Sequence, residues 1–171
     1  VAECKRVIGE RYGQNAQAQQ ASPHFARVIN QRHTQRIAGL LQDAVAKGAR
    51  TLTGGEVDVA GCYIAPTLLD QVPRDAAIMS EEIFGPLLPI LTFRNVDEVV
   101  RQINEGPKPL ALYVFSQDKA RTRRILAQTS SGGVALGTNR PCQTVTLTSL
   151  SAGVSDRLGA LGSSGERCGS V

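Results

Sequence analysis

The sequence contains no tryptophan, and only 4% of its 171 residues are aromatic. Its 19 basic and 15 acidic residues leave a net charge of +4, and the basic residues are scattered, with the densest group at 120–124. Proteins that bind single-stranded nucleic acid stack its bases on aromatic side chains within a basic groove. Because basic and aromatic residues do not alternate here, we expect no nucleic-acid binding.

Long apolar runs are missing as well, since no stretch approaches the roughly 20 apolar residues of a membrane span. The contents of 42% hydrophobic and 20% charged residues are those of an ordinary globular protein. Residues 1–13 contain charges throughout and lack the apolar region of a signal peptide. We therefore expect a soluble protein without a membrane segment, and the absent initiator methionine indicates a piece of a longer one.

The cysteines do not form close pairs. They are Cys4, Cys62, Cys142 and Cys168. Tetrahedral zinc sites usually draw ligands from C-x-x-C pairs, so we predict no metal site and expect free thiols in a reducing, cytoplasmic compartment. Cys4 lies beside Lys5 and Arg6, but no histidine or other base is placed to activate it. We predict no catalytic residue in this chain.

The first half of the sequence predicts helices followed by short strands. A helix ends at Gly13, and residues 13–22 have the composition of a polar surface loop. Ser22 and Pro23 predict the start of a long amphipathic helix, or two in tandem, that continues to Gly48. A short strand follows at "RTLTGG", and in the next extended piece, "CYIAPTLLD", Pro66 indicates an edge strand or a bulge.

From residue 87 the pattern changes to alternating strands and helices. Strands are predicted at 87–93, 110–115 and 132–137, with helices at 96–104 and 118–128 between them. Asn95 and Glu98 form a capping box at the first of these helices. The strands are continuous hydrophobic runs, which is typical of a parallel sheet covered on both faces. The sequence therefore predicts an α/β fold with a parallel-sheet βαβαβ unit.

One stretch, "MSEEIFGPLLPIL" at 79–91, places two carboxylates and a phenylalanine ahead of an apolar strand. Glu81 and Glu82 are suited to capping a short helical turn through its dipole. Alternatively, one carboxylate accepts hydrogen bonds from a vicinal diol such as a ribose, Phe84 offers a flat wall to a ring, and Gly85-Pro86 sets the turn. Composition and spacing leave both interpretations open. The glycines near 132 lack the G-x-G-x-x-G pattern of a phosphate loop.

Several segments, in this order, resemble the aldehyde dehydrogenase superfamily, and most of all its class 3 branch of fatty, aromatic and coniferyl aldehyde dehydrogenases. They are "FARVINQRHTQRIAGLL", "YIAPTLL", "EEIFGPLLPI", "PLALYVFS" and "TSSGGVA". The resemblance implies that residues 1–143 form the C-terminal portion of the α/β catalytic domain and that 144–150 form part of an oligomerisation strand. It also implies a homodimer in the full-length enzyme.

In this family the second glutamate of E-E-I-F-G-P binds the hydroxyls of the nicotinamide ribose, and the phenylalanine packs beside the nicotinamide. The resemblance thus assigns cofactor binding, with NAD or NADP as the cofactor, to Glu82 and Phe84, with Leu110 bordering the same ring. Glu81 is expected to support the turn. The family reaction begins with a cysteine thiolate attacking an aldehyde and yields a carboxylic acid, but the G-Q-x-C setting of that cysteine is not in this sequence.

The C-terminal region departs from the family. Residues 136–143 are about two residues longer than in relatives, and residues 151–171 form an atypical Gly/Ser-rich tail that we expect to be disordered. A natural tail and a shifted reading frame both remain possible. Three hypotheses for the function follow: a partial aldehyde dehydrogenase, a non-catalytic remnant or interaction module, and a small protein that binds nucleotides or diols.

Overall fold

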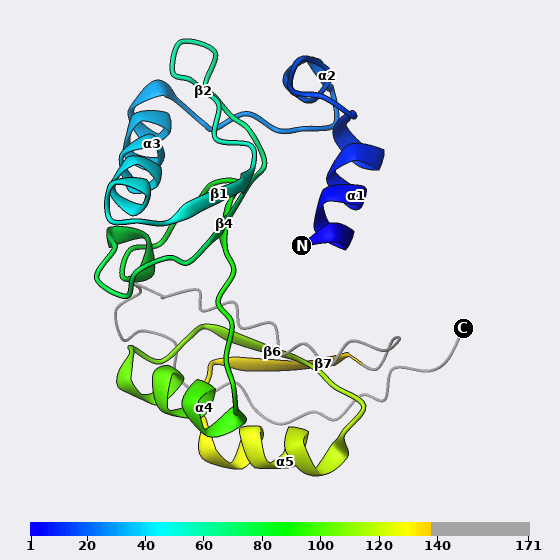
Figure 1. Cartoon of the computed structure of the whole chain (residues 1–171), viewed down its shortest axis with the longest axis vertical. Helices are drawn as coiled ribbons and strands as arrows, with labels where there is room; N and C mark the ends of the chain where they lie inside the picture. The colour runs from blue at the N-terminus through cyan, green and yellow to red at the C-terminus, as the bar shows by residue number, and fades with distance from the viewer. Residues whose placement is uncertain (138–171) are drawn as a thin grey trace, which may run out of the picture.

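The computed structural model describes residues 1–137, and Figure 1 labels most of their elements. The helices are α1 (Ala2–Tyr12), α2 (Ala16–Ala21), α3 (Gln31–Ala46), α4 (Val96–Glu105) and α5 (Lys119–Gln128), with a 3-10 turn, η1 (Ala77–Met79). The strands are β1 (Arg50–Thr53), β2 (Val57–Asp58), β3 (Tyr63–Ile64), β4 (Thr67–Asp70), β5 (Leu87–Pro89), β6 (Ala111–Phe115) and β7 (Gly133–Gly137). Two strand pairs, β4–β5 and β6–β7, are parallel, so the predicted α/β class is confirmed.

Two helices occupy the N-terminal region. α1 ends at Gly13, the predicted stop, which has a φ of 125°. The prediction of a polar loop over residues 13–22 is wrong, because Asn15 accepts a hydrogen bond from the amide of Ala18 at 2.9 Å and caps α2. Alanine and glutamine are good helix formers, so a polar composition did not exclude a helix.

The amphipathic helix α3 begins later than predicted. Its N-cap is Asn30, whose side chain accepts a hydrogen bond from the first turn at 2.9 Å, so the predicted start at Ser22 is wrong. The predicted end at Gly48 is confirmed, since that residue has a φ of 109° directly after the C-cap. The predicted amphipathic pattern is confirmed for Ile37, Leu40, Leu41 and Ala44, which are buried, whereas Val45, which belongs to the same pattern, is 46% exposed.

The first sheet has the strand order β1-β4-β5 and lies beside α3 (Figure 1). β1 confirms the strand predicted at "RTLTGG", and β4 is the central strand, antiparallel to β1 and parallel to β5. Of the two alternatives predicted at Pro66, the edge strand is wrong, because Pro66 directly precedes the central strand β4 and needs no ladder hydrogen bond there. The other alternative, a bulge, agrees with the register shift between Thr51 and Thr53 in the β1–β4 pair. The core of this part joins α3 to the strands through Ile37, Leu41, Ile64, Leu69 and Leu87.

The second sheet pairs β6 with β7 through the connecting helix α5. Asn95 accepts a hydrogen bond from the amide of Glu98 at 2.9 Å, and Glu98 accepts one from the amide of Arg94 at 3.2 Å, so the predicted capping box of α4 is confirmed. α4 and α5 lie on one side of the two strands (Figure 1). The core between these helices and β6 consists of Val100, Leu112, Val114 and Ile125.

One prediction for this half is confirmed and one is wrong. β6, α5 and β7 form a parallel βαβ unit, as predicted. The described residues form no single βαβαβ sheet, because β5 spans only Leu87–Pro89 and pairs with β4, apart from β6 and β7. Within residues 1–137, the strands of this second sheet have apolar side chains that no described residue covers: the exposed fraction is 39% for Tyr113 and Phe115, 51% for Val134 and 56% for Leu136. An apolar run indicates strand propensity but does not say which neighbour covers the strand.

Several predictions concern residues outside the described range. They are the domain boundary at residue 143, the oligomerisation strand at 144–150, the tail at 151–171 and most of the insertion at 136–143. All of these stay predictions. Within residues 1–137, no helix is both long and apolar enough to cross a membrane.

Candidate functional site

The two adjacent acids lie between η1 and β5, on the segment 80–86. The amide of Glu81 donates a hydrogen bond to the carbonyl of Ala77 at 2.9 Å, so both acids follow the C-terminal end of η1. A carboxylate is unfavourable near that end of the helix dipole. The interpretation of Glu81 and Glu82 as dipole-favoured caps of a helical turn is therefore wrong.

The N-terminal end of η1 is capped by a residue of α3 instead. Asp43 Oδ2 accepts a hydrogen bond from the amide of Ala77 at 2.7 Å. That bond lowers the pKa of Asp43 below its usual value of 3.8, and the nearby Lys47 lowers the pKa further. Lys47 Nζ lies 3.0 Å from Asp43 and also donates to the carbonyl of Asp75 at 2.7 Å. Helix α3 thus holds the segment that leads into the two acids.

Another residue of α3, Arg36, binds the backbone of the motif itself. Its Nη1 donates to the carbonyl of Glu82 at 3.0 Å, and its Nη2 donates to the carbonyl of Ile83 at 2.6 Å. Arg36 is not among the site residues predicted from the sequence. The only signal was a charged row at intervals of seven and four residues, Arg36, Asp43 and Lys47, which repeats on one helical face.

The two acids have different surroundings. Glu81 is exposed and its carboxylate lies 3.9 Å from Arg36 Nη1. Glu82 is half-buried, and within residues 1–137 its carboxylate has no hydrogen-bond or ion-pair partner. The structure therefore leaves the second acid available to accept hydrogen bonds from a ligand, while the first faces α3.

Phe84 lies two residues after Glu82 and points to solvent. Its side chain is 76% exposed, and its backbone φ is 45°, in the left-handed region that an aromatic residue rarely adopts. Such strained residues gather at functional sites. The next residue, Gly85, lies against α3, because a Cβ there would come within 2.7 Å of Ile37 Cδ1. The glycine of the predicted Gly-Pro turn is thus needed for a close approach to the helix.

Leu110, the third predicted cofactor residue, belongs to the other sheet. It precedes β6, its side chain is 53% exposed, and its carbonyl accepts a hydrogen bond from the amide of Gly133 at 2.8 Å. The structure places Glu82 and Phe84 on one segment and Leu110 on another. All three precede the amino ends of strands, whereas ligands of open α/β sheets usually bind beyond the carboxyl ends.

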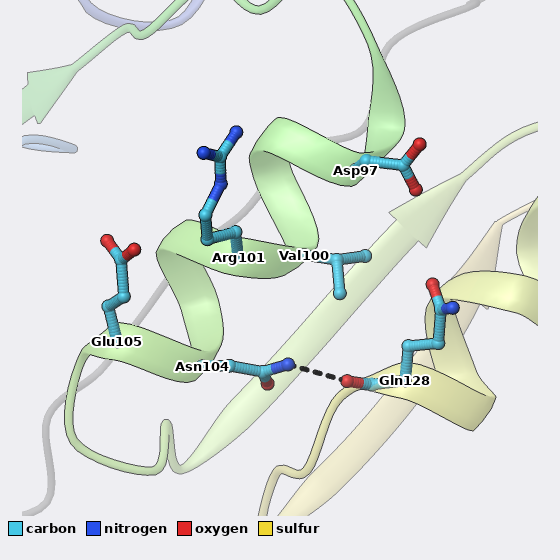
Figure 2. A pocket seen from close by; sticks show the side chains of 6 residues that line it. All are labelled: Asp97, Val100, Arg101, Asn104, Glu105 and Gln128. Atoms are coloured by element: carbon cyan, nitrogen blue, oxygen red, sulfur yellow. Dashed lines mark hydrogen bonds between the residues drawn. The ribbon is translucent and has the colours of Figure 1, made fainter.

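The surface of residues 1–137 includes two recesses. A small one of about 270 Å³ lies against the motif and is lined mainly by apolar groups from Gly85, Pro86, Leu87, Leu68 and Ile8. A larger, open one of about 570 Å³ lies between α4 and α5, where Asn104 donates to the carbonyl of Gln128 at 2.8 Å (Figure 2). Figure 2 shows Asp97, Arg101 and Glu105 on its rim, a mixed and solvated set of charges. The smaller recess is the one that adjoins the predicted site.

The described part of the chain offers no metal centre. Residues 1–137 contain no group of three or more His, Cys, Asp or Glu side chains that could hold a metal ion. Cys4 and Cys62 are both free thiols and partly buried, while Cys142 and Cys168 lie outside the described residues.

Comparisons with known proteins identify the family of the chain. A model of the aldehyde dehydrogenase family matches residues 10–153. Aldehyde dehydrogenase family 3 member A2 of Mus musculus is 46% identical over 134 residues, which are 78% of this chain and 26% of that protein. The dimeric NADP-preferring aldehyde dehydrogenase of Canis lupus familiaris is 42% identical over 134 residues, again 78% of this chain and 28% of that protein.

A solved structure shows the same relationship. The substrate-bound state of Staphylococcus aureus AldH matches with a TM-score of 0.72 and 44% identity, over 79% of this chain and 28% of that chain. The chain therefore spans about a quarter of the length of these relatives. The matches confirm the resemblance found in the sequence, and the described fold corresponds to part of the matched structure.

Proposed function

Because the chain belongs to the aldehyde dehydrogenase family, we propose that it is part of an enzyme that oxidises an aldehyde to a carboxylic acid with NAD or NADP. Within that enzyme, residues 81–86 hold the nicotinamide end of the cofactor. The observation that supports this role is the carboxylate of Glu82, which has no partner within residues 1–137 and lies beside the outward-facing Phe84.

The residues present fit a nicotinamide nucleoside. A ribose presents two adjacent hydroxyl donors, and an ionised carboxylate with two free oxygens accepts both. Phe84 supplies an apolar face for the neighbouring ring. Leu110, whose side chain is 53% exposed, is proposed as a second apolar wall of the cofactor site. This role requires the two sheets to face one ligand in the full-length enzyme.

The chemical role of these residues is to orient the cofactor, whose nicotinamide ring would supply the hydride acceptor when bound. Glu82 fixes the ribose, and Phe84 limits the tilt of the ring that the ribose bears. Hydride transfer depends on the alignment of donor and acceptor carbons, so small displacements slow it strongly. By family resemblance, the attacking thiolate and the water-activating glutamate belong to other parts of the enzyme. We expect the 171-residue chain alone to form no NAD(P)H from an aldehyde.

Assembly and location are also proposed. The relative from Canis lupus familiaris is named dimeric and NADP-preferring, which favours a homodimer and leaves both NAD and NADP as cofactors here. The free thiols of Cys4 and Cys62 favour a reducing, cytoplasmic compartment.

A second candidate function is that of a non-catalytic remnant or interaction module. It is favoured by the absence of G-Q-x-C from the sequence and by the exposed apolar side chains of β6 and β7. The two proposals differ in the role of Glu82, because only a cofactor-binding segment needs the carboxylate of this residue.

The test compares Glu82→Gln with Glu81→Gln in a full-length enzyme that contains this chain. Each charge-assisted hydrogen bond contributes about 1.5–3 kcal/mol, so Glu82→Gln should slow hydride transfer on the order of tenfold or more. Glu81→Gln should change it much less. Single-turnover kinetics with a deuterated aldehyde measure the step. An unchanged rate, cofactor affinity and isotope effect in Glu82→Gln would contradict the proposal.

A further inference from the structure

Arg36 is the side chain that holds the backbone of the proposed cofactor segment. Among residues 1–137, no other side chain is hydrogen-bonded to residues 82–84. Its two terminal nitrogens reach two consecutive carbonyls, those of Glu82 at 3.0 Å and Ile83 at 2.6 Å. A planar guanidinium presents such donors in a rigid fork, so the two carbonyls are fixed relative to each other.

These two carbonyls adjoin the strained residue. The Ile83 carbonyl belongs to the peptide group that defines the φ of Phe84, and that φ is 45°. This conformation is unfavourable for an L residue, which relaxes from it unless the surrounding structure holds it. Arg36 holds the preceding peptide group and thereby opposes relaxation of Phe84.

Arg36 also interacts differently with the two acids. Its Nη1 lies 3.9 Å from the carboxylate of Glu81, which attracts that side chain toward α3. The carboxylate of Glu82 is left without a partner in the described part of the chain, although Arg36 binds its carbonyl. One guanidinium therefore restrains the first acid and presents the second.

The helix that bears Arg36 is a firm support. Ile37, the next residue, is completely buried and contacts Gly85 at the other end of the motif. Asp43 of the same helix binds the amide of Ala77, and Lys47, the C-cap of that helix, binds the carbonyl of Asp75. The position of Arg36 is thus fixed relative to both ends of the segment.

We propose that Arg36 is a positioning residue for cofactor binding: it holds residues 82–84 in the conformation that presents the Glu82 carboxylate and the Phe84 ring to the nicotinamide nucleoside. This inference rests on the proposed function of residues 81–86. Arg36 acts through the backbone of the segment, and its removal therefore loosens that backbone whether or not a cofactor is present.

The first test measures the segment itself in the 171-residue chain. Chymotrypsin cleaves after exposed aromatic residues, and the bond between Phe84 and Gly85 is such a site. Arg36→Ala should raise the cleavage rate at this bond on the order of tenfold, with Arg36→Lys between Arg36→Ala and the unaltered chain. Arg32→Ala is the matched control, since Arg32 is exposed on the same helix and makes no side-chain hydrogen bond among the described residues.

The second test measures cofactor affinity in a full-length enzyme that contains this chain. Arg36→Ala should raise the dissociation constant of NAD or NADP on the order of tenfold, and Arg36→Lys should recover part of the loss. If Glu82→Gln weakens binding and Arg36→Ala does not, the positioning role is overturned while the proposed function stands. If neither variant changes affinity, the proposed function fails.

A general loss of folding is distinguished by the pattern of cleavage. Unfolding raises cleavage at all aromatic residues, including Tyr113 and Phe115 in the other sheet, whereas loosening of the segment raises it at Phe84 alone. If Arg36→Ala unfolds the chain, Arg36→Lys decides the question. Cleavage at Phe84 and cofactor affinity equal to those of the unaltered protein in Arg36→Lys would overturn the requirement for the two-donor fork.

Discussion

The carboxylate of Asp43 accepts a hydrogen bond from the backbone amide of Ala77 at 2.7 Å, 34 residues along the chain. A side chain of α3 thereby caps η1, the turn that precedes the candidate site. The cap is stronger when Asp43 is ionised, because a charged acceptor bonds an amide more strongly than a neutral one.

The first prediction is that this cap is lost in acid. The pKa of Asp43 is lowered in the folded protein from 3.8, first by the amide of Ala77 and then by Lys47. A lowered folded pKa stabilises the protein above the unfolded value, and this stabilisation disappears as the pH falls through the folded pKa. Urea unfolding between about pH 6 and about pH 2.5 should show a smaller loss of stability with acid in Asp43→Asn than in the unaltered chain. Asp75→Asn, on the held segment but without a side-chain hydrogen bond among the described residues, should show the full loss.

The second prediction concerns the strain at Phe84. A left-handed conformation costs an L residue about 1–2 kcal/mol, and glycine avoids that cost. Because the ring is 76% exposed, its removal loses little burial. The free energy of unfolding, measured in urea, should therefore be about 1 kcal/mol higher for Phe84→Gly than for Phe84→Ala. Equal stabilities would show that Phe84 is not held in this conformation in solution. In the full-length enzyme both variants should bind the cofactor equally poorly, since both lack the ring.

The third prediction concerns the contact between Gly85 and α3. A methyl group at Gly85 would lie 2.7 Å from Ile37 Cδ1, and Ile37 is fully buried. Gly85→Ala should lower the free energy of unfolding by about 1–3 kcal/mol through overpacking. Ile37→Val removes the clashing carbon, so the double variant should lose less than the sum of the single losses. As a control, Gly39→Ala, in α3 with open space around it, should be neutral or stabilise by about 0.5–1 kcal/mol.

The fourth prediction concerns a buried hydroxyl at the start of β4. Thr67 is 1% exposed, donates to the carbonyl of Ala65 at 2.7 Å and accepts from the amide of Gly55 at 3.0 Å. Thr67→Val keeps the shape and leaves both backbone groups without this partner, which should cost about 1–3 kcal/mol of unfolding free energy. Thr51→Val, at an exposed position of β1, should change stability by less than about 0.5 kcal/mol. A loss in Thr51→Val as large as in Thr67→Val would contradict this account.

Local signals in the sequence were sufficient for several elements. Asn95 and Glu98 predicted the capping box of α4, and Gly13 and Gly48 predicted the ends of α1 and α3. Each of these signals depends on residues within one or two helical turns, so the adjacent sequence contains all the interacting groups. The errors at residues 13–22 and at Ser22 also concern local signals, because Asn15 and Asn30 cap α2 and α3 and were not recognised as caps in the sequence.

The assignment of Glu82 and Phe84 as candidate cofactor residues came from the motif E-E-I-F-G-P, and the sequence by itself determined the family of this chain and its α/β class. Only the tertiary structure decided that β5 pairs with β4, that one face of β6 and β7 is exposed, that Phe84 is left-handed, and that Arg36 holds the motif. The bonds from Arg36 to the carbonyls of Glu82 and Ile83 join residues 46 and 47 positions apart. Backbone carbonyls have the same chemistry in every residue, so no pattern of side chains marks which of them a distant guanidinium binds until the chain has folded.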